Sequence, residues 1–322
     1  MAPWEYMYET DIFGVNIPGN NRTYFVSVMG SAGQMPALAA YDGAGALQMF
    51  WELQEEDSGL QPWAIVDIPH FLLSFPGKDF PDPGKLNHFK PDGVNSDEGV
   101  IPVIDKVVPG FVYFPPEGKD LDDLLFVFEQ SIEVLKRASE DKYFLMPDGF
   151  TDDDYLVRES KSGPAGHRWS DFYRNIPPRK IVYSGKYSKK LLTSLSNTSK
   201  TREIVQLDLV LVPNPVMDKG PKGYFAYALL ITNVETGSID GLKLLTPFPN
   251  LHAMHESVPE HVLKLLINMP RVPRVIEVRT SLMTTLLTSL LKRAGIIVRR
   301  VDKLESIDNA AESFIYYLDK GN

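Results

Sequence analysis

Hydrophobic residues in the last part of the chain alternate between the spacing of strands and the spacing of helices. Residues 273–301, PRVIEVRTSLMTTLLTSLLKRAGIIVRRV, contain a short apolar run, then leucines that recur every three or four positions, then a second apolar run after Gly295. Short β-branched runs are typical of strands, and a glycine often follows the end of a helix. This stretch therefore predicts a strand, a helix and a second strand.

The same reasoning predicts an order of β-β-β-α-β-α-β-α from residue 204 onward. Its later strand–helix–strand steps require parallel pairing through right-handed crossovers. Ser257 and Pro259 are expected to begin the first of the helices, since serine caps helices and proline favours the first turn. The elements lie, in this order, at residues 204–212, 224–233, 238–245, 258–269, 275–278, 282–294, 296–301 and 307–318.

In the N-terminal half the strands come first. Residues 23–28 and 36–41 predict a hairpin with a glycine-rich loop. Residues 120–138 predict a long helix, because acids cluster in its first turn and basic residues in its last, as the helix dipole favours. This half is expected to be α+β. Its other expected elements are a helix near residues 47–53, strands at 61–75 and 111–114, and strands or a short helix at 155–159 and 169–173.

The net charge changes sign near residue 178. Residues 1–178 carry 13 basic and 29 acidic side chains, a net charge of −16, whereas residues 179–322 carry 20 and 13, a net charge of +7. A chain of 322 residues is also longer than one hydrophobic core usually supports. We therefore expect two domains, residues 1–178 and 179–322, and residues 179–203 are expected to connect them.

The composition excludes several kinds of site. The chain has no cysteine, which removes disulfides, thiolate zinc sites, iron–sulfur clusters and cysteine nucleophiles. No window approaches the roughly 18–20 uninterrupted apolar residues that a membrane helix needs, so no membrane partner is expected. The acidic first residues do not form a signal peptide, and a cytoplasmic location is the expectation.

Several segments resemble known folds. IVQLDLVLVP, GYFAYALLITNVETGSIDGLKLL, PRVIEVRTSL and LLKRAGIIV resemble ribonuclease H-like folds, in particular the integrase and transposase group, through topology and spacing over residues 200–320. The resemblance implies an α/β C-terminal domain with a mixed sheet. The chain as a whole resembles an uncharacterised family of bacterial proteins that pair two domains of unknown function, on YFVSVMGSAGQMPALAAYDGAGAL and PGFVYFPP. That family implies an architecture and no activity.

The ribonuclease H-like resemblance implies acids on the first strand, at the end of the fourth strand and on the last helix. Two-metal phosphoryl transfer needs such a cluster to hold Mg²⁺ or Mn²⁺. Asp208 matches the first position and Glu312 the last, but the fourth-strand position holds Arg279, or Val278 in a shifted register. An arginine repels a metal. Glu277 joins the acids only through a bulge or another register. The alternative for Asp208 is pairing with a lysine or arginine.

A second candidate site is the histidine cluster in LHAMHESVPEH. His252 and His255 are spaced to share a helical face, and with His261 they are candidate ligands of a transition metal. Asp240 or Glu256 would complete the set. Alternatively, the segment is a loop that leads into a helix and carries surface or capping histidines, since it lacks the HExxH pattern.

The basic and aromatic run RKIVYSGKYSKK, at residues 179–190, is a candidate nucleic-acid site. Tyrosines stack on bases while cations meet phosphates. The alternative is a solvated linker. The glycine-rich turns of the N-terminal half lack a phosphate-binding pattern, and no G-x-S-x-G motif is present. The residues of this candidate site are Arg179, Lys180, Tyr183, Lys186, Tyr187, Lys189 and Lys190.

Three functional hypotheses follow. We expect a non-catalytic binding or interaction protein without a cofactor, because the fourth-strand carboxylate is missing and the two halves carry opposite charge. The partner could be another protein, and the sequence does not identify it further. The first alternative is a divergent metal-dependent nuclease or phosphodiesterase that uses Asp208 and Glu312 with Mg²⁺ or Mn²⁺. The second is nucleic-acid binding without cleavage.

Overall fold

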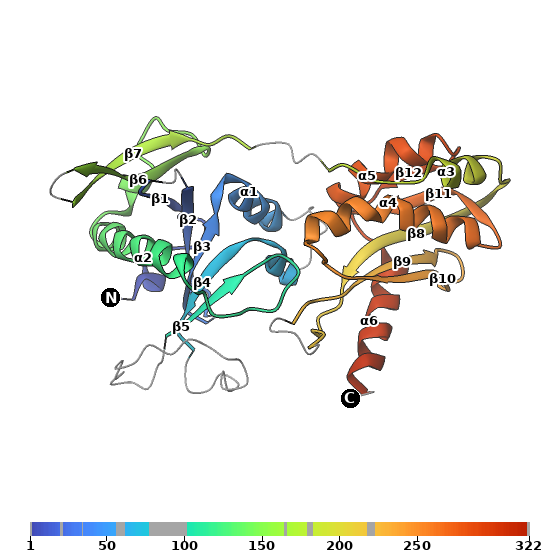
Figure 1. Ribbon diagram of the computed structural model, residues 1–322, viewed down its shortest axis with the longest axis horizontal. Helices are drawn as coiled ribbons and strands as arrows, with labels where there is room; N and C mark the ends of the chain where they lie inside the picture. The colour runs from blue at the N-terminus through green and yellow to red at the C-terminus, as the bar shows by residue number, and fades with distance from the viewer. Residues whose placement is uncertain are drawn as a thin grey trace. The chain divides into compact units, whose positions relative to one another are not determined.

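The chain forms two compact units (Figure 1). A computed structural model describes residues 2–19, 22–33, 35–55, 62–76, 102–163, 166–178, 183–217 and 223–320. Two short stretches from the N-terminal half of the sequence group with the second unit rather than with the first. The first unit comprises Met1–Trp51, Ile68–Val108 and Tyr113–Arg179, and the second comprises Glu52–Asp67, Pro109–Val112 and Lys180–Asn322.

A seven-stranded mixed sheet forms the centre of the first unit. Its strands are β1 (Phe13–Ile17), β2 (Arg22–Met29), β3 (Ala37–Asp42), β4 (His70–Ser74), β5 (Val103–Val107), β6 (Asp154–Gly163) and β7 (Gly166–Asn175). They are arranged in the order β5-β4-β3-β2-β1-β6-β7. Neighbours pair antiparallel, except that β1 and β6 run parallel. Strands β2 and β3 form the predicted hairpin, in whose loop Gly30 and Gly33 have positive φ angles of 112° and 84°.

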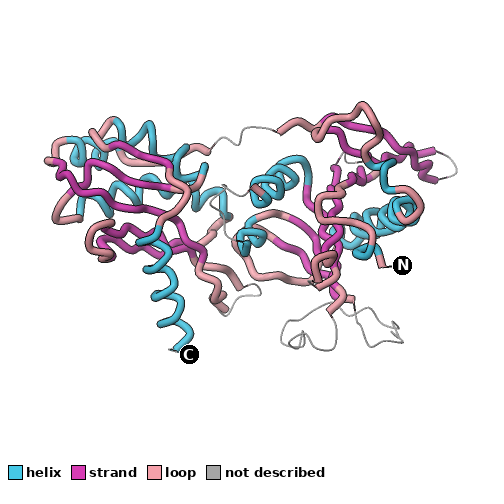
Figure 2. The backbone as a smooth tube through the Cα atoms, turned by 180° about the vertical axis from the view of Figure 1, so that it is seen from behind, coloured by secondary structure: helices cyan, strands magenta, loops and turns pink. Residues whose placement is uncertain are grey.

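Two helices, α1 (Gly43–Gln54) and α2 (Lys119–Ala138), cover opposite faces of this sheet (Figure 2). Successive residues of a strand point to opposite faces, so each helix packs on alternate positions. Leu124 of α2 belongs to the same core cluster as Val26. On the other face, the ring of Phe50 from α1 lies 4.9 Å from the ring of Tyr41. Two short 3-10 helices, η1 (Pro3–Glu5) and η4 (Lys142–Leu145), complete the unit.

Several expectations for the N-terminal half are wrong in detail. The described part of residues 61–75 is a 3-10 helix, η2 (Pro62–Asp67), followed by the short strand β4, rather than one strand. Phe111 and Phe114 make isolated bridges and no continuous strand. Strands β1 and β5 were not expected, because FGVNI contains glycine and asparagine and VIDKV contains two charged residues, which strands disfavour.

The second unit contains a five-stranded mixed sheet. Its strands are β8 (Lys200–Leu211), β9 (Tyr227–Asn233), β10 (Ile239–Leu245), β11 (Val272–Val278) and β12 (Ile297–Arg300). They are arranged in the order β10-β9-β8-β11-β12. Strand β9 is antiparallel to both of its neighbours, whereas β8, β11 and β12 are parallel to one another. Strands β10, β11 and β12 therefore run in the same direction, so the segments that join them must return the chain to the starting end of the sheet.

Four helices belong to this unit: α3 (Lys189–Ser196), α4 (Leu251–Asn268), α5 (Ser281–Lys292) and α6 (Glu305–Lys320). Helix α6 lies on one face of the sheet, while α4 and α5 lie on the other (Figures 1 and 2). The side chains that join α6 to the sheet include Ile307, Ala311 and Leu230. Helix α4 begins seven residues earlier than expected, because the Asn250 side chain accepts a hydrogen bond of 2.8 Å from the N–H of Ala253.

The two N-terminal stretches in the second unit make specific contacts there. The ring of Phe111 lies 5.5 Å from the ring of Phe248, and Phe111 forms a bridge with Tyr224. The hydroxyl of Tyr227 donates a hydrogen bond to the carboxylate of Asp67. Burial raises the pKa of Asp67 to about 7, although the bond from Tyr227 opposes that rise. The second unit therefore depends on side chains that come long before residue 178.

The observed class is mixed α+β, with two mixed sheets and, in the described part of the chain, six α-helices. The prediction of an α+β first half and a mixed sheet in the second half is confirmed at this level. None of the helices within the described ranges is long and apolar enough to cross a membrane.

Candidate functional site

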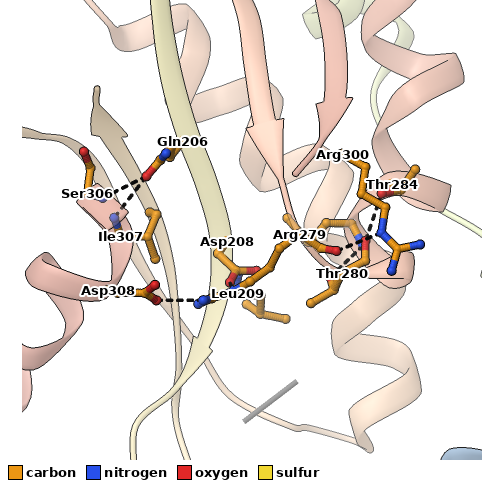
Figure 3. Close-up of polar contacts among 11 residues, drawn as sticks. Gln206, Asp208, Leu209, Arg279, Thr280, Thr284, Arg300, Ser306, Ile307 and Asp308 are labelled. Atoms are coloured by element: carbon orange, nitrogen blue, oxygen red, sulfur yellow. Dashed lines mark hydrogen bonds and ion pairs between the residues drawn. The ribbon is translucent and has the colours of Figure 1, made fainter. Parts of the chain in front are cut away.

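Strand β8 presents two buried polar side chains to the face of the sheet that α6 covers. Gln206 and Asp208 are two residues apart and therefore project from the same face. They are only 6% and 3% exposed. On the same face of the neighbouring strand β9, Leu230 lies opposite Asp208 and the buried Thr232 lies opposite Gln206. The polar part of this face thus lies below the first turn of α6, and Figure 3 shows it.

Arg279, which directly follows β11, lies between two carboxylates. Its Nε donates a hydrogen bond of 2.7 Å to Oδ2 of Asp208, and its Nη1 donates one of 2.7 Å to Oδ1 of Asp308. The backbone N–H of Leu209 donates to the other oxygen of Asp208 at 2.9 Å (Figure 3). We call Asp208, Arg279 and Asp308 the Asp–Arg–Asp cluster. The expected alternative for Asp208, pairing with a basic side chain, is what the structure shows.

Burial and charge act in opposite directions on the pKa values of this cluster. Burial raises the pKa of Asp208 above its usual value, while the charge and hydrogen bond of Arg279 oppose that rise. Burial lowers the pKa of Arg279, but the carboxylates of Asp208 and Asp308 outweigh it and raise that pKa. A guanidinium does not lose its proton in proteins. A permanent positive charge therefore lies between the two acids.

The acid of the last helix in this cluster is Asp308, and the predicted Glu312 is exposed. Helix α6 starts at Glu305, and Ile307 is fully buried against the sheet. Asp308 lies one helical turn before Glu312, nearer to the strand ends. The helix predicted at residues 307–318 contains Asp308, but the acid chosen from it, Glu312, lies one turn too far along. The signal that would have found Asp308 is the spacing of four residues from Glu312.

Glu277 of β11 contacts Gln206 rather than the Asp–Arg–Asp cluster. Its Oε2 accepts a hydrogen bond of 3.0 Å from Nε2 of Gln206, and its other oxygen pairs with Arg299. Oε1 of Gln206 accepts hydrogen bonds from the N–H groups of Ser306 and Ile307 at 2.9 and 3.4 Å (Figure 3). These N–H groups have no partner inside the helix. Gln206 therefore caps α6, and Glu277 orients Gln206.

The Asp–Arg–Asp cluster does not fit a divalent metal ion. Metal sites for phosphoryl transfer need carboxylates that face the ion, and here both acids face Arg279 and form ion pairs with it. Arg279 is also fixed by its surroundings, because Arg300 donates a hydrogen bond of 3.1 Å to its carbonyl oxygen. Over the residues that the structure describes, no three His, Cys, Asp or Glu side chains are arranged to hold a metal ion.

The predicted histidine cluster lies on α4 rather than in a loop. Nε2 of His252 is 3.8 Å from Oε1 of Glu256, one turn further along. The ring of His255 packs edge-on against Tyr183, with the ring centroids 6.3 Å apart. Burial, with a smaller contribution from the charge of His252, lowers the pKa of His255 to about 4. His255 is therefore a neutral packing residue at physiological pH.

The other two predicted members of that cluster are engaged separately. His261 is half-buried near the middle of α4, and burial, Lys264 and Lys243 all lower its pKa. Oδ1 of Asp240 accepts a hydrogen bond of 2.8 Å from the hydroxyl of Ser238. The histidines and acids of this segment thus serve helix packing and local hydrogen bonds.

Residues of the predicted nucleic-acid segment are already in contact with α4 and α5. Nζ of Lys186 lies 2.6 Å from Oε2 of Glu256, and the hydroxyl of Tyr187 accepts a hydrogen bond of 2.9 Å from Arg293. The ring of Tyr183 packs against the ring of His255 on α4. Of the remaining residues, Lys189 and Lys190 are exposed in the first turn of α3, and Arg179 and Lys180 lie outside the described residues.

Tyr183 and Tyr187 also line a small pocket against α5. Its volume is about 160 Å³, and Leu286, Leu290 and Arg293 form the opposite side. Pockets that bind small molecules usually begin at about 300 Å³. This pocket is therefore too small to enclose a nucleotide.

Two family models match the chain. Residues 1–158 match a domain of unknown function (DUF7309), and residues 191–315 match a second domain of unknown function (DUF6930). No curated protein and no solved structure shows significant similarity to the chain. The comparisons therefore agree with the predicted pairing of two uncharacterised domains, and they attach no activity to either one.

Proposed function

Because the chain combines DUF7309 and DUF6930, two domains of unknown function, we propose a function from the site itself. Residues 179–322 form a ribonuclease H-like domain that has no catalytic metal site, and the protein acts as a non-catalytic binding or interaction module. One observation carries this proposal: Arg279 lies between Asp208 and Asp308, where a catalytic member would hold a metal.

The order of the elements supports the ribonuclease H-like part of the proposal. Three strands, β8 to β10, are followed by alternating helices and strands and by the closing helix α6. Asp208 lies on the first of these strands, Arg279 directly follows the fourth, and Asp308 lies on the last helix. Hydrogen bonds join the side chains at these three positions. The resemblance implies that the same three positions meet in the catalytic centre of active members.

The chemistry of Arg279 supports the non-catalytic part. A guanidinium is permanently charged and makes directional bonds to carboxylates, so it replaces the positive charge of a metal without offering an electrophile or a bound water. The first alternative, a nuclease that uses Asp208 and Glu312, has less support, because Glu312 is exposed and Asp208 is bonded to Arg279.

The second alternative, nucleic-acid binding without cleavage, also has less support. Its aromatic candidates, Tyr183 and Tyr187, are engaged within the unit, and Lys186 is paired with Glu256. The net charge of +7 on residues 179–322 is what favours it. A cytoplasmic location and membership of a bacterial family belong to the same proposal, and the absence of cysteine agrees with that location.

A cleavage assay tests this proposal. We expect the full-length protein with Mg²⁺ or Mn²⁺ to leave single-stranded and duplex DNA, RNA and RNA–DNA hybrids intact. The matched control is Asp208→Asn, which keeps the shape and one acceptor oxygen of Asp208. Cleavage by the wild type that Asp208→Asn abolishes would restore the nuclease hypothesis. Binding to these polyanions that weakens steeply with added salt would favour the second alternative.

A further inference from the structure

Helix α2 of the first unit has apolar residues on two sides. Its inward side packs on the sheet through residues such as Leu124 and Val134. That inward side also contains Asp123 and Gln130, which are 3% and 8% exposed. Meanwhile Leu125, on the outward side, is 59% exposed. A surface helix normally presents polar residues to the outside. The exposed side of α2 instead combines charged residues with two exposed apolar ones, Leu125 and Ile132.

Beside its sheet-facing residues α2 has a regular apolar stripe, in which Phe128 also packs against the core cluster: Leu121, Leu125, Phe128 and Ile132. Successive members are four, three and four positions apart, which is the a/d spacing of helices that pack side by side. Leu125 and Ile132 are 59% and 46% exposed, while Leu121 and Phe128 are half-buried at the base of the stripe. Single exposed apolar residues are common, but a stripe with helix-packing spacing is typical of a contact surface.

The charges beside the stripe are distributed unevenly along α2. Asp122 lies in the first turn and Lys136 in the last turn. Both are exposed, and both occupy the position that flanks an apolar a/d seam on the same side. Charges at that position pair across helix–helix contacts and determine the orientation of the helices. An antiparallel partner with the same sequence places its Lys136 beside Asp122, and its Asp122 beside Lys136.

We propose that α2 is a homodimer contact, in which the helix packs antiparallel against α2 of a second copy of the chain. The two-fold axis passes near Phe128, because one register then brings Leu125 next to the second copy's Ile132 and also brings Asp122 next to the second copy's Lys136. Both pairings are symmetric, as a two-fold contact requires. The helix dipoles also oppose each other in this arrangement.

The proposed register makes one unfavourable contact, which sharpens the test. Glu129 is exposed, flanks the seam and lies next to the proposed axis, so it meets its own copy. Like charges at such a position weaken association. The contact is therefore of the weak, reversible kind that a single helix pair supports. Glu129→Gln should therefore tighten the dimer. This effect is not expected if α2 binds a different partner or packs in parallel.

Sedimentation velocity of the full chain over an approximately hundred-fold concentration range measures self-association directly. We expect a reversible monomer–dimer equilibrium that Leu125→Glu with Ile132→Glu weakens at least about tenfold. The matched control is Leu242→Glu, which changes a leucine on β10 that is 43% exposed, close to the 46% of Ile132, and it should leave the equilibrium unchanged. Circular dichroism of each variant checks that it is folded.

A charge exchange tests the orientation. Asp122→Lys and Lys136→Asp should each weaken the dimer, and the double variant should restore it, because the two charges pair across the contact. A protein that stays monomeric at every concentration overturns the proposal, including the case in which the second unit of the same chain covers the stripe. A dimer that is insensitive to the stripe variants also overturns it.

Because the chain has no cysteine, an introduced cysteine is the only thiol that a cross-linking reagent can modify. An equal mixture of the single variants Asp122→Cys and Lys136→Cys should give a cross-linked dimer that contains one of each with a short bifunctional thiol reagent. Asp122→Cys alone should not, because an antiparallel pair separates the two copies of residue 122 by roughly 20 Å at 1.5 Å per residue. Efficient linking of Asp122→Cys to itself would show a parallel pair and contradict the proposal.

Discussion

Each unit of the molecule contains an arginine between two aspartates, and the two clusters differ in burial. In the first unit, Arg22 donates hydrogen bonds of 2.7 and 2.5 Å to Asp42 and lies 3.4 Å from Asp123. In the second unit, Arg279 joins Asp208 and Asp308. The side chain of Arg22 is 37% exposed, whereas that of Arg279 is 8% exposed.

The comparison shows that the same three charges have different energetic consequences. Water screens the pair that Arg22 forms with the partly exposed Asp42, so this pair adds little stability, whereas the side chain of Asp123 is only 4% exposed. Around Arg279 and Asp208 water is largely excluded, so these two charges depend on each other for solvation, while Asp308 is 40% exposed. The pair of Arg279 and Asp208 is therefore the more sensitive to the loss of one partner, because both of its members are buried, whereas Arg22 and Asp42 are both partly exposed.

The largest expected effect comes from Arg279→Met. This change leaves the buried carboxylate of Asp208 without its partner and should lower the free energy of unfolding of the second unit by about 3–5 kcal/mol. Hydrogen exchange of the amides in β8 and β9 measures it for that unit alone, since the two units need not unfold together.

The matched variant is Arg279→Met combined with Asp208→Asn and Asp308→Asn, which removes all three charges. It should recover part of the lost stability, because no uncompensated charge remains in the sheet. If Arg279→Met alone costs less than about 1 kcal/mol, Arg279 is not the partner on which Asp208 depends, and the contrast between the two clusters disappears.

A buried base should behave differently when no carboxylate within the described part of the chain pairs with it, and His70 of β4 provides that case. It is 3% exposed, its Nδ1 lies 2.8 Å from the carbonyl oxygen of Ile68, and the rings of Tyr41 and Tyr113 lie next to it. Burial lowers the pKa of His70 from 6.5 to about 4. The imidazole is therefore neutral in the folded protein, whereas Arg279 is charged.

The sign of the resulting pH dependence follows from this lowered pKa. The unfolded chain binds a proton near pH 6.5, and the folded chain does so only near pH 4, so stability falls as the pH drops through this window. Between pH 7 and pH 5, we expect the first unit to lose about 2 kcal/mol. Urea unfolding of the wild type and of His70→Gln at both pH values checks it, and an equal slope in the variant would rule out His70 as the cause.

The smallest effect should come from Arg22→Met, at about 1–2 kcal/mol in low salt. Because Arg22 is partly exposed, the effect should shrink when about 1 M NaCl is added, which reduces the screening length to about 3 Å. The effect of Arg279→Met should change little under the same conditions. A salt dependence of equal size for both variants would show that water reaches both clusters to the same extent.

Much of the fold could be predicted from local patterns. Helix α2 could be predicted from the acids in its first turn, the spacing of its apolar residues and the basic residues in its last turn. The order of strands and helices from β8 to α6 could be predicted from the spacing of apolar residues and the positions of glycines. Strands β1 and β5 were missed, because their stability comes from neighbouring strands rather than from their own composition. The stretches 52–67 and 109–112 belong to the second unit through contacts such as Phe111 with Phe248, which no local pattern reveals.

The candidate site was partly predictable for the same reason. Asp208 and Arg279 could be named from strand positions, and their pairing was among the expected outcomes. Asp308 and the capping role of Gln206 depend on how α6 crosses the sheet and on the residue at which it starts. Those features are set by packing between elements that are about 100 positions apart in the sequence, so spacing alone does not specify them.

The most direct test of the central claim is a thermal-shift titration of the wild type and Asp208→Asn with Mn²⁺ and Mg²⁺. A ligand that binds only the folded state raises its stability once its concentration exceeds the dissociation constant. Since Arg279 already forms ion pairs with both Asp208 and Asp308, we expect no saturable shift in either protein. A saturable rise in the melting temperature of the wild type, absent in Asp208→Asn, would show that a metal displaces Arg279 and would contradict the account.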